Sequence, residues 1–293
     1  METITFLQGF ASPALDAFFR FCTQLGGTNA YIVFLLTVYL AVDSRLGTRL
    51  GVFVLVGYYL NFHLKGLLDT DRPFELDPAL GRTPEARLVE SGPGFPSAHA
   101  QMSLTFWGYL AWWLRRRWFW GVAVPIIVLV SLSRLYLGMH FPVDVLGGFA
   151  IGLLYTAVVI LAEPLWPSLR RVPKGVRLAL GLSIPLLLML LLPPPGQEPD
   201  LITGGLAAFL TAPLLLPYAP PRSLWGRLAV ALVGTVLVFA ALSASSLLLP
   251  EALKRDPLGG FVRYLLIAYV GLLVTPWLAQ RLGRVPAGAD AAR

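Results

Sequence analysis

Apolar runs alternate with short polar loops along almost the whole chain. A helix rises about 1.5 Å per residue, so about 20 apolar residues cross the roughly 30 Å hydrocarbon layer of a bilayer. The apolar runs predict membrane-crossing helices at residues 31–42 (extended back toward residue 26), 50–64, 99–114, 118–135, 143–161, 178–192, 201–216, 228–249 and 261–278. We therefore expect an all-α, polytopic membrane protein with about nine transmembrane helices.

The first 24 residues have a different pattern. Apolar and polar residues each recur every four positions, the apolar set at 6, 10, 14, 18 and 22 and the polar set at 8, 12, 16 and 20. Two stripes on opposite sides of one helix are typical of a helix that lies in the membrane interface. We expect residues 1–24 to form such an amphipathic interfacial helix, bent at Pro13, with a tenth span as the alternative.

The composition agrees with a membrane protein. Hydrophobic residues make up 56% and charged residues 13% of the 293 residues, and the mean hydropathy is +0.70. Soluble domains carry about 25% charged residues, so an ordinary soluble enzyme is excluded, and a disordered chain would have the opposite balance. The single cysteine, Cys22, excludes an internal disulfide and a cysteine-based zinc site.

The charges are distributed unevenly between the two sides of the predicted bundle. The chain has 23 lysine and arginine residues and 16 acidic residues, a net charge of +7. Most basic residues lie in the loops after the odd-numbered spans, where the acidic residues are only Asp43, Glu163 and Asp290. The positive-inside rule makes that side cytoplasmic, with the N-terminus outside and the C-terminus inside. Because membrane orientation accounts for the basic charge, we expect membrane lipids and no nucleic acid as partners.

Several of the remaining basic residues cluster on the outer side. Lys65 closes the second span, Arg134 closes the fourth, and arginines at 72, 82 and 87 lie in the loop that follows Lys65. Any single charge at a span end usually only reaches toward the interface. The cluster gains weight because two of the three histidines of the chain lie on the same side.

These two histidines stand at the beginnings of predicted spans. His99 follows Ser97, a good N-cap residue, and the free N–H groups of a helix N-terminus suit an anion. His140 precedes the fifth span, and Asp144, four residues later, shares its helix face. A carboxylate that binds one ring nitrogen fixes the tautomer and leaves the other nitrogen available as a nucleophile.

The spacing brings these residues to one side of the membrane. Between His99 and Ser133 lie 33 residues, which suffices for two spans of about 17 residues joined by a tight turn. Two crossings return the chain to its starting side, so residues 65–73, 96–99 and 133–144 all reach the outer surface. Cations, imidazoles, a carboxylate and a helix N-terminus together favour phosphoryl transfer, in which catalysis is mostly positioning and charge neutralisation.

In chain order the motifs are Lys65-(six residues)-Arg72-Pro73, Pro96-Ser97-Ala98-His99 and Ser133-Arg134-(five residues)-His140-(three residues)-Asp144. This arrangement resembles the three-part signature of the type 2 phosphatidic acid phosphatase superfamily. Members of that superfamily include lipid phosphate phosphatases, bacterial undecaprenyl-diphosphate phosphatases, glucose 6-phosphatase and the soluble vanadium haloperoxidases. The resemblance covers about residues 1–165 and implies an integral-membrane phosphatase.

The resemblance also implies a role for each motif residue. His140 attacks phosphorus and forms a phosphohistidine, Asp144 supports His140, and His99 protonates the leaving oxygen and then assists the attacking water. The phosphoryl oxygens are held by side chains or amides of Lys65, Arg72, Ser97, Ala98 and Arg134. No metal and no other cofactor is implied.

One motif position departs from the family, which usually has glycine where this chain has Ala98. Alanine disfavours a positive φ by roughly 1 kcal/mol. The residue after an N-cap should be helical, so we expect Ala98 to be helical and to cost nothing. Outside the motifs, we interpret Asp69-Thr70-Asp71 as part of a solvated loop rather than a metal site, and residues 74–95 as a candidate lid.

The expected organisation is an interfacial helix at 1–24, a catalytic membrane core at 25–165 and a four-helix extension at 166–293. The expected reaction is hydrolysis of a lipid phosphate or diphosphate, foremost undecaprenyl diphosphate, at the outer membrane face. The alternatives are lipid-to-lipid phosphotransfer, another phospholipid or a soluble sugar phosphate as substrate, and a non-catalytic transporter or scaffold. The sequence leaves a homodimer surface, a lipid groove or a thicker bundle open as uses of the last four spans.

Overall fold

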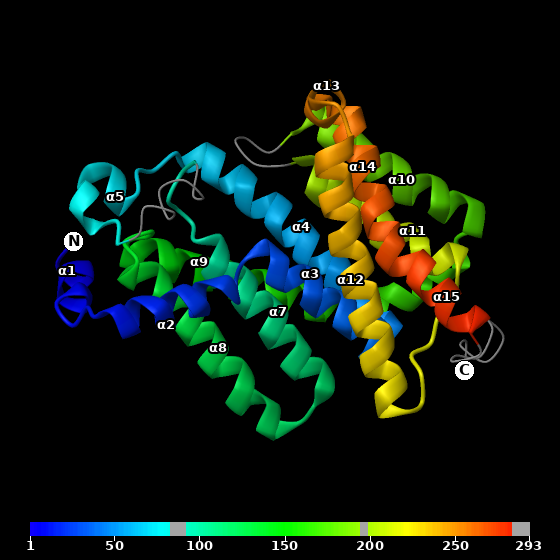
Figure 1. Cartoon of the computed structure of the whole chain (residues 1–293), viewed down its shortest axis with the longest axis horizontal. Helices are drawn as coiled ribbons and strands as arrows, with labels where there is room; N and C mark the ends of the chain where they lie inside the picture. Colours follow the sequence, from blue (N-terminus) through cyan, green and yellow to red (C-terminus); the bar gives the residue numbers. More distant parts are fainter. Residues whose placement is uncertain (83–91, 194–198, 283–293) are drawn as a thin grey trace. The chain divides into compact units, whose positions relative to one another are not determined.

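The computed structural model describes residues 1–82, 92–193 and 199–282, and the regular structure within these ranges is helical (Figure 1). The chain forms two compact units. The first comprises Met1–Tyr31 and Gly57–Glu163. The second comprises Ile32–Val56, Pro164–Pro193 and the described residues after 198. All the motif residues belong to the first unit, which therefore contains the candidate site.

The first unit is built around α7. Its helices are α1 (Glu2–Gln8), α2 (Pro13–Gln24), the start of α3 (Thr28–Thr37), the second half of α4 (Ser44–Leu68), α5 (Pro73–Leu76), α7 (Ala98–Leu114), α8 (Arg117–Tyr136) and α9 (Pro142–Ala162), with a 3-10 turn η2 (Pro78–Leu80). α7 packs against both α8 and α9, and α1 and α2 lie against α8 (Figure 1).

The close approach of α7 and α9 depends on glycines of α9. A Cβ atom on Gly148 would lie 2.6 Å from the Ser97 carbonyl oxygen, and one on Gly152 would lie 2.9 Å from the Gln101 carbonyl oxygen. No side chain fits at either distance, so only glycine lets the two helix backbones come together. The contact places Asp144, in the first turn of α9, beside the start of α7.

The N-terminal residues form two helices rather than one bent helix. α2 begins at Pro13, where proline suits the first helical position, and Ser12 caps it by accepting a hydrogen bond from the Leu15 amide at 3.3 Å. Phe6 of α1, Phe18 of α2 and Phe10 between the two helices are exposed. The break at Pro13 agrees with the sequence prediction, whereas the position in the membrane interface is not confirmed.

The second unit holds the C-terminal helices. They are α10 (Lys174–Leu191), α11 (Pro199–Leu215), α12 (Leu224–Leu248), α13 (Glu251–Arg255), α14 (Pro257–Tyr269) and α15 (Thr275–Arg281), and the unit also includes the π-helical turns η1 (Val38–Val42) and η4 (Val270–Val274) and most of the 3-10 segment η3 (Glu163–Arg171). α11 packs against α10 and α14 and is largely buried.

Six helical stretches among the described residues are long and apolar enough to cross a membrane. They are Ser44–Leu76, Arg117–Tyr136, Pro142–Arg171, Lys174–Leu191, Leu224–Leu248 and Pro257–Arg281. A seventh results if α2 and the Thr28–Val42 stretch, bent by 53°, are one broken span. The expected nine spans are not confirmed, because α7 and α11 have only 17 residues each and are largely buried within their units.

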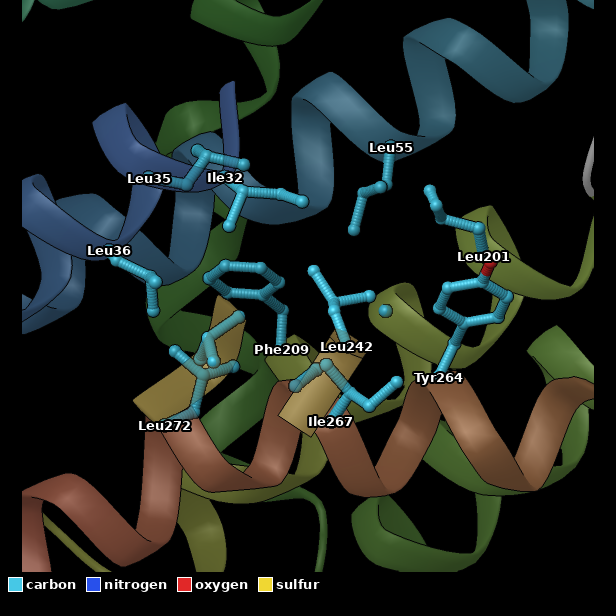
Figure 2. Close-up of a pocket in the computed structure, with 13 residues that line it drawn as sticks. Ile32, Leu35, Leu36, Leu55, Leu201, Phe209, Leu242, Tyr264, Ile267 and Leu272 are labelled. Atoms are coloured by element: carbon cyan, nitrogen blue, oxygen red, sulfur yellow. The ribbon is translucent and has the colours of Figure 1, made fainter. Parts of the chain in front are cut away.

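The second unit has an apolar cavity of about 100 Å³. Figure 2 shows aliphatic side chains from several helices around the ring of Phe209, with Tyr264 at one end. Leu36 and Leu55 come from the N-terminal part of this unit, and Leu242 and Ile267 from α12 and α14. All the residues that line the cavity belong to the second unit.

Candidate active site

Two cations from the first motif are held by backbone carbonyls. Lys65 and Arg72 are 5% and 2% exposed. Lys65 Nζ donates to the carbonyl oxygens of residues 93 and 94 at 2.5 and 3.0 Å. Arg72 donates to the carbonyl oxygens of residues 92, 93 and 139 at 2.8, 3.3 and 3.1 Å. Both side chains are therefore fixed in place by bonds to main-chain oxygens.

The segment that supplies these carbonyls is itself fixed from two sides. The Gly94 amide donates to the Thr70 carbonyl, and the Phe95 amide donates to Thr70 Oγ1, each at 2.7 Å. The Ser97 amide donates to the Asp144 carbonyl oxygen at 3.0 Å. The first and second motifs are thus joined through Thr70, and the second and third through Asp144.

His140 lies in the turn between α8 and α9 and is 1% exposed. Its Nδ1 is 3.3 Å from Asp144 Oδ2, and its Nε2 is 3.4 Å from Arg72 Nη1. Asp144 Oδ2 also accepts a hydrogen bond from the Phe141 amide at 2.8 Å. With the proton on Nδ1, the carboxylate fixes the ring and the lone pair of Nε2 is directed toward the guanidinium.

The surroundings of His140 keep its ring neutral. Burial holds the pKa of His140 well below its usual value near 6.5, and the nearby cations Arg72, Arg134 and Lys65, together with His99, lower it further. A neutral imidazole retains the lone pair that a nucleophile needs. The same cations that suit a phosphate group therefore also keep the ring reactive.

This pKa gives a direct prediction. Burial and the nearby cations both disfavour the protonated ring, so neutral His140 persists at pH values below 6.5. The loss of kcat/KM in acid that results from protonation of His140 should therefore also occur below pH 6.5. Titration of protein labelled with ¹³C-histidine should find the His140 imidazole still neutral at pH values just below 6.5. Its signal is assigned by comparison with the His63→Ala and His99→Gln variants. Titration of His140 at or above 6.5 would contradict this electrostatic environment.

The start of α7 presents the second motif. Ser97 is its N-cap residue and is fully buried, and Ser97 Oγ has no hydrogen-bond partner within residues 1–82, 92–193 and 199–282. A buried hydroxyl without a partner costs free energy unless a ligand binds it. Ala98 is the first residue of α7 and is helical, as the sequence predicted. The amides of this first turn and Ser97 Oγ are thus suited to hold phosphate oxygens.

Arg134 and His99 complete the set of predicted residues. Arg134, in the last turn of α8, is 2% exposed, and its Nη1 donates to Thr23 Oγ1 at 2.6 Å. His99 is half-buried, and its ring lies against Gly26, where an added Cβ would be 2.7 Å from His99 Cδ2. Both residues are close enough to His140 to lower its pKa. Hydrogen bonds and this electrostatic coupling therefore connect all three motifs.

Other sequence-derived candidates lie elsewhere. Arg82 pairs with Asp16 at 2.8 Å instead of facing His140. Asp69 and Asp71 are exposed, in agreement with a solvated loop. Arg87 and residues 83–91 of the candidate lid lie outside the described residues.

Sequence reasoning missed the contacts that N-terminal residues make with this site. The polar stripe at positions 8, 12, 16 and 20 was the available signal, but we predicted from it only a helix in the membrane interface. In the structure Gln8 and Asp16 bind protein groups instead, including the Tyr136 carbonyl and hydroxyl. A stripe of polar residues does not distinguish water from a polar protein surface.

Comparison with known proteins agrees with the motif assignment. Residues 46–166 match the PAP2 superfamily, and residues 201–287 match the PAP2 superfamily phosphatase transmembrane extension. No solved structure has significant similarity to this chain.

Three relatives are examples of similar proteins. Mouse sphingosine-1-phosphate phosphatase 2 is 34% identical over 155 residues, which cover 50% of this chain and 42% of the relative. Phosphatidylglycerophosphatase B of Bacillus subtilis is 39% identical over 74 residues (22% and 36%), and the undecaprenyl-diphosphatase of Sulfolobus acidocaldarius is 30% identical over 113 residues (37% and 50%). The chain thus spans at most half the length of each of these relatives. Together, the two family matches and the connected motifs establish that the chain belongs to the PAP2 superfamily.

Proposed function

We propose that this protein hydrolyses a lipid phosphate or diphosphate without a metal ion, through a phosphohistidine at His140. The observation that carries the proposal is the environment of this one ring. Its Nδ1 is held by Asp144, its Nε2 faces Arg72, and buried cations surround it. A phosphate group placed against Nε2 would meet positive charge on its oxygens and a neutral nucleophile at phosphorus.

In the first step, the lone pair of His140 Nε2 forms a bond to phosphorus as the bond from phosphorus to the lipid oxygen breaks. His99 donates its proton to that leaving oxygen, so the lipid departs as an alcohol or, from a diphosphate, as a monophosphate. The equatorial oxygens of the transferring group bear the developing charge, which Lys65, Arg72 and Arg134 neutralise.

In the second step, neutral His99 accepts a proton from a water molecule whose oxygen attacks phosphorus. The bond between phosphorus and Nε2 breaks, inorganic phosphate leaves, and His140 regains its lone pair. His99 ends the cycle protonated, ready for another leaving group. Asp144 keeps the proton on Nδ1 throughout, so that Nε2 is the nitrogen that reacts.

A lipid is the best-supported class of substrate. The site lies at the ends of helices that are long and apolar enough to span a membrane, where a headgroup can reach the site while its tail stays in hydrocarbon. The named relatives act, by their names, on different lipid phosphates. We take undecaprenyl diphosphate as the first candidate among them.

We place the site on the non-cytoplasmic side of the membrane. α7 begins at the site and ends at the basic turn of residues 115–117, and α8 begins at that turn and returns to the site. The three arginines are therefore at the opposite ends of these helices from His140. By the positive-inside rule that turn is cytoplasmic. If α11 also crosses the membrane, as the nine expected spans require, the C-terminus is cytoplasmic as well.

The decisive experiment measures phosphate release by detergent-purified protein in the presence of EDTA. The lipid panel contains undecaprenyl diphosphate, sphingosine 1-phosphate, phosphatidylglycerophosphate and phosphatidic acid, and glucose 6-phosphate is the soluble comparison. We expect release from at least one lipid, at rates above that with the sugar phosphate, and unchanged by EDTA. Loss of release in EDTA would contradict the metal-independent mechanism, and a preference for glucose 6-phosphate would contradict the lipid assignment.

A further inference from the structure

The polar side of the N-terminal helices faces the segments that lead to His140. Gln8 Nε2, at the end of α1, donates to the Leu80 carbonyl at 2.8 Å and to the Tyr136 carbonyl at 2.9 Å. Leu80 ends the η2 turn of the loop after Arg72, and Tyr136 ends α8. One amide group of α1 therefore joins two segments that are more than 50 residues apart in sequence.

Asp16 makes a second connection to the same two segments. Its carboxylate accepts hydrogen bonds from Arg82 Nη2 at 2.8 Å and from the Tyr136 hydroxyl at 2.6 Å. The Tyr136 ring stacks on Phe19 of α2, with centroids 4.4 Å apart. Because the Asp16 and Arg82 side chains are only 21% and 29% exposed, solvent screens this ion pair less than one on an open surface.

The turn held in this way is the one that carries the nucleophile. Gly138, two residues before His140, has φ of +69°, and a Cβ there would lie 2.0 Å from the Leu80 carbonyl oxygen. The backbone of residues 137–139 is therefore in direct contact with the η2 turn. Apolar side chains of the N-terminal helices, including Leu7 and Leu15, cover the Tyr136–Met139 cluster.

The end of α2 contacts the site itself. Thr23 Oγ1 accepts the 2.6 Å hydrogen bond from Arg134, and Gly26, just after α2, lies against the His99 ring. These contacts join residues more than 70 positions apart, so they form only in the folded protein. The PAP2 superfamily match begins at residue 46, so all of these N-terminal residues lie outside it.

We infer that α1 and α2 hold active-site residues of this protein in position, and that Thr23 is the positioning residue for Arg134. The inference rests on the proposed function, because it assigns Arg134 to the phosphoryl oxygens. A guanidinium that is oriented before substrate binds needs no rearrangement when charge develops in the transition state. Gln8 and Asp16 likewise hold the turn before His140 in position through their hydrogen bonds.

The test compares Thr23→Val with Thr23→Ser. Valine keeps the shape of threonine but cannot accept the hydrogen bond, whereas serine keeps the hydroxyl. We expect Thr23→Val to lower kcat/KM about tenfold, because a lost hydrogen bond to a charged group typically has an effect of that size. Thr23→Ser should stay within about twofold of wild type. Thr28→Val, at an exposed threonine of α3, is the matched control.

Two further measurements separate positioning from a general structural effect. In an Arg134→Lys background, Thr23→Val should lower kcat/KM by less than about twofold, because the partner of the hydroxyl has already been replaced. The pKa of His140, measured by NMR, should rise in Thr23→Val, because an Arg134 that is no longer held has a weaker effect on the ring.

The outcomes distinguish this inference from the proposed function. Equal losses of kcat/KM in Thr23→Val and Thr23→Ser would indicate a packing defect and overturn the positioning role. The same conclusion would follow if Thr23→Val lowered kcat/KM equally in the wild-type and Arg134→Lys backgrounds. An unchanged kcat/KM together with an unchanged His140 pKa would overturn it as well. The NMR measurement needs no turnover, so it tests the positioning of Arg134 even if wild type releases no phosphate from any lipid of the panel. Absence of phosphate release would overturn the proposed function and not the positioning of Arg134.

Discussion

Replacement of His140 with alanine is expected to lower phosphate release by about ten-thousandfold or more, to the background rate. Alanine removes the only atom that we propose to bond to phosphorus. The surrounding cations would still bind the substrate, so KM or substrate affinity should change much less than kcat. Steady-state kinetics on the best lipid of the panel measures both quantities.

A trapping experiment identifies the covalent step. Wild type mixed with a ³²P-labelled lipid phosphate and quenched in alkali should retain label on the protein, because a phosphohistidine survives alkali and is lost in acid. The His140→Ala protein should retain none. His63→Ala is the matched control, because His63 lies in α4 with its ring against Tyr59 and outside the proposed machinery. Label that persists in His140→Ala would assign the intermediate to another residue.

The general course of the chain could be predicted from its hydrophobic pattern. Each of the nine predicted spans corresponds to a helical stretch. The helix that begins at Ala98 has Ser97 at its N-cap position, as predicted, although the Ser97 hydroxyl makes no capping hydrogen bond. The number of spans could not be predicted in the same way. α7 combines apolar residues with buried polar ones such as Gln101 and Ser103, and such a helix can be covered by protein instead of lipid.

The candidate site was predictable to the extent that its residues lie in three short motifs. The four-residue separation of His140 and Asp144 determines their contact, because such residues lie one helical turn apart. The contact between Arg72 and His140 depends on the folding of 67 intervening residues, and the spacing argument indicated only that both reach one side. Thr23 was missed for the same reason, since nothing in its local sequence points to Arg134.

The backbone contribution to the site was also beyond sequence reasoning. The carbonyls of residues 92–94 hold Lys65 and Arg72, and a carbonyl is present in every residue type. Only the path of residues 92–97, fixed by Thr70 and Asp144, places these oxygens near the cations. The sequence therefore predicts candidate side chains for the chemistry but not the main-chain groups that orient them.

Replacement of Asp144 with asparagine is expected to lower kcat by about a hundredfold to ten-thousandfold while the protein remains folded. Asparagine has the shape of aspartate, and its side-chain oxygen can still accept the hydrogen bond from the Phe141 amide. It carries no charge, so it stabilises the Nδ1 proton of His140 less while phosphorus is bound to Nε2. The rate of phosphohistidine formation, measured by rapid quench, should fall in parallel with kcat.

The control for this substitution is Asp69→Asn. Asp69 is exposed and has φ of +38°, a conformation that asparagine adopts readily. The Asp69 variant should match wild type, which would show that loss of one carboxylate in this unit is not by itself harmful. If Asp144→Asn also retained activity within a few-fold of wild type, the carboxylate would not control the tautomer of His140. The choice of Nε2 as the nucleophile would then depend on the cations facing that nitrogen, chiefly Arg72, rather than on Asp144.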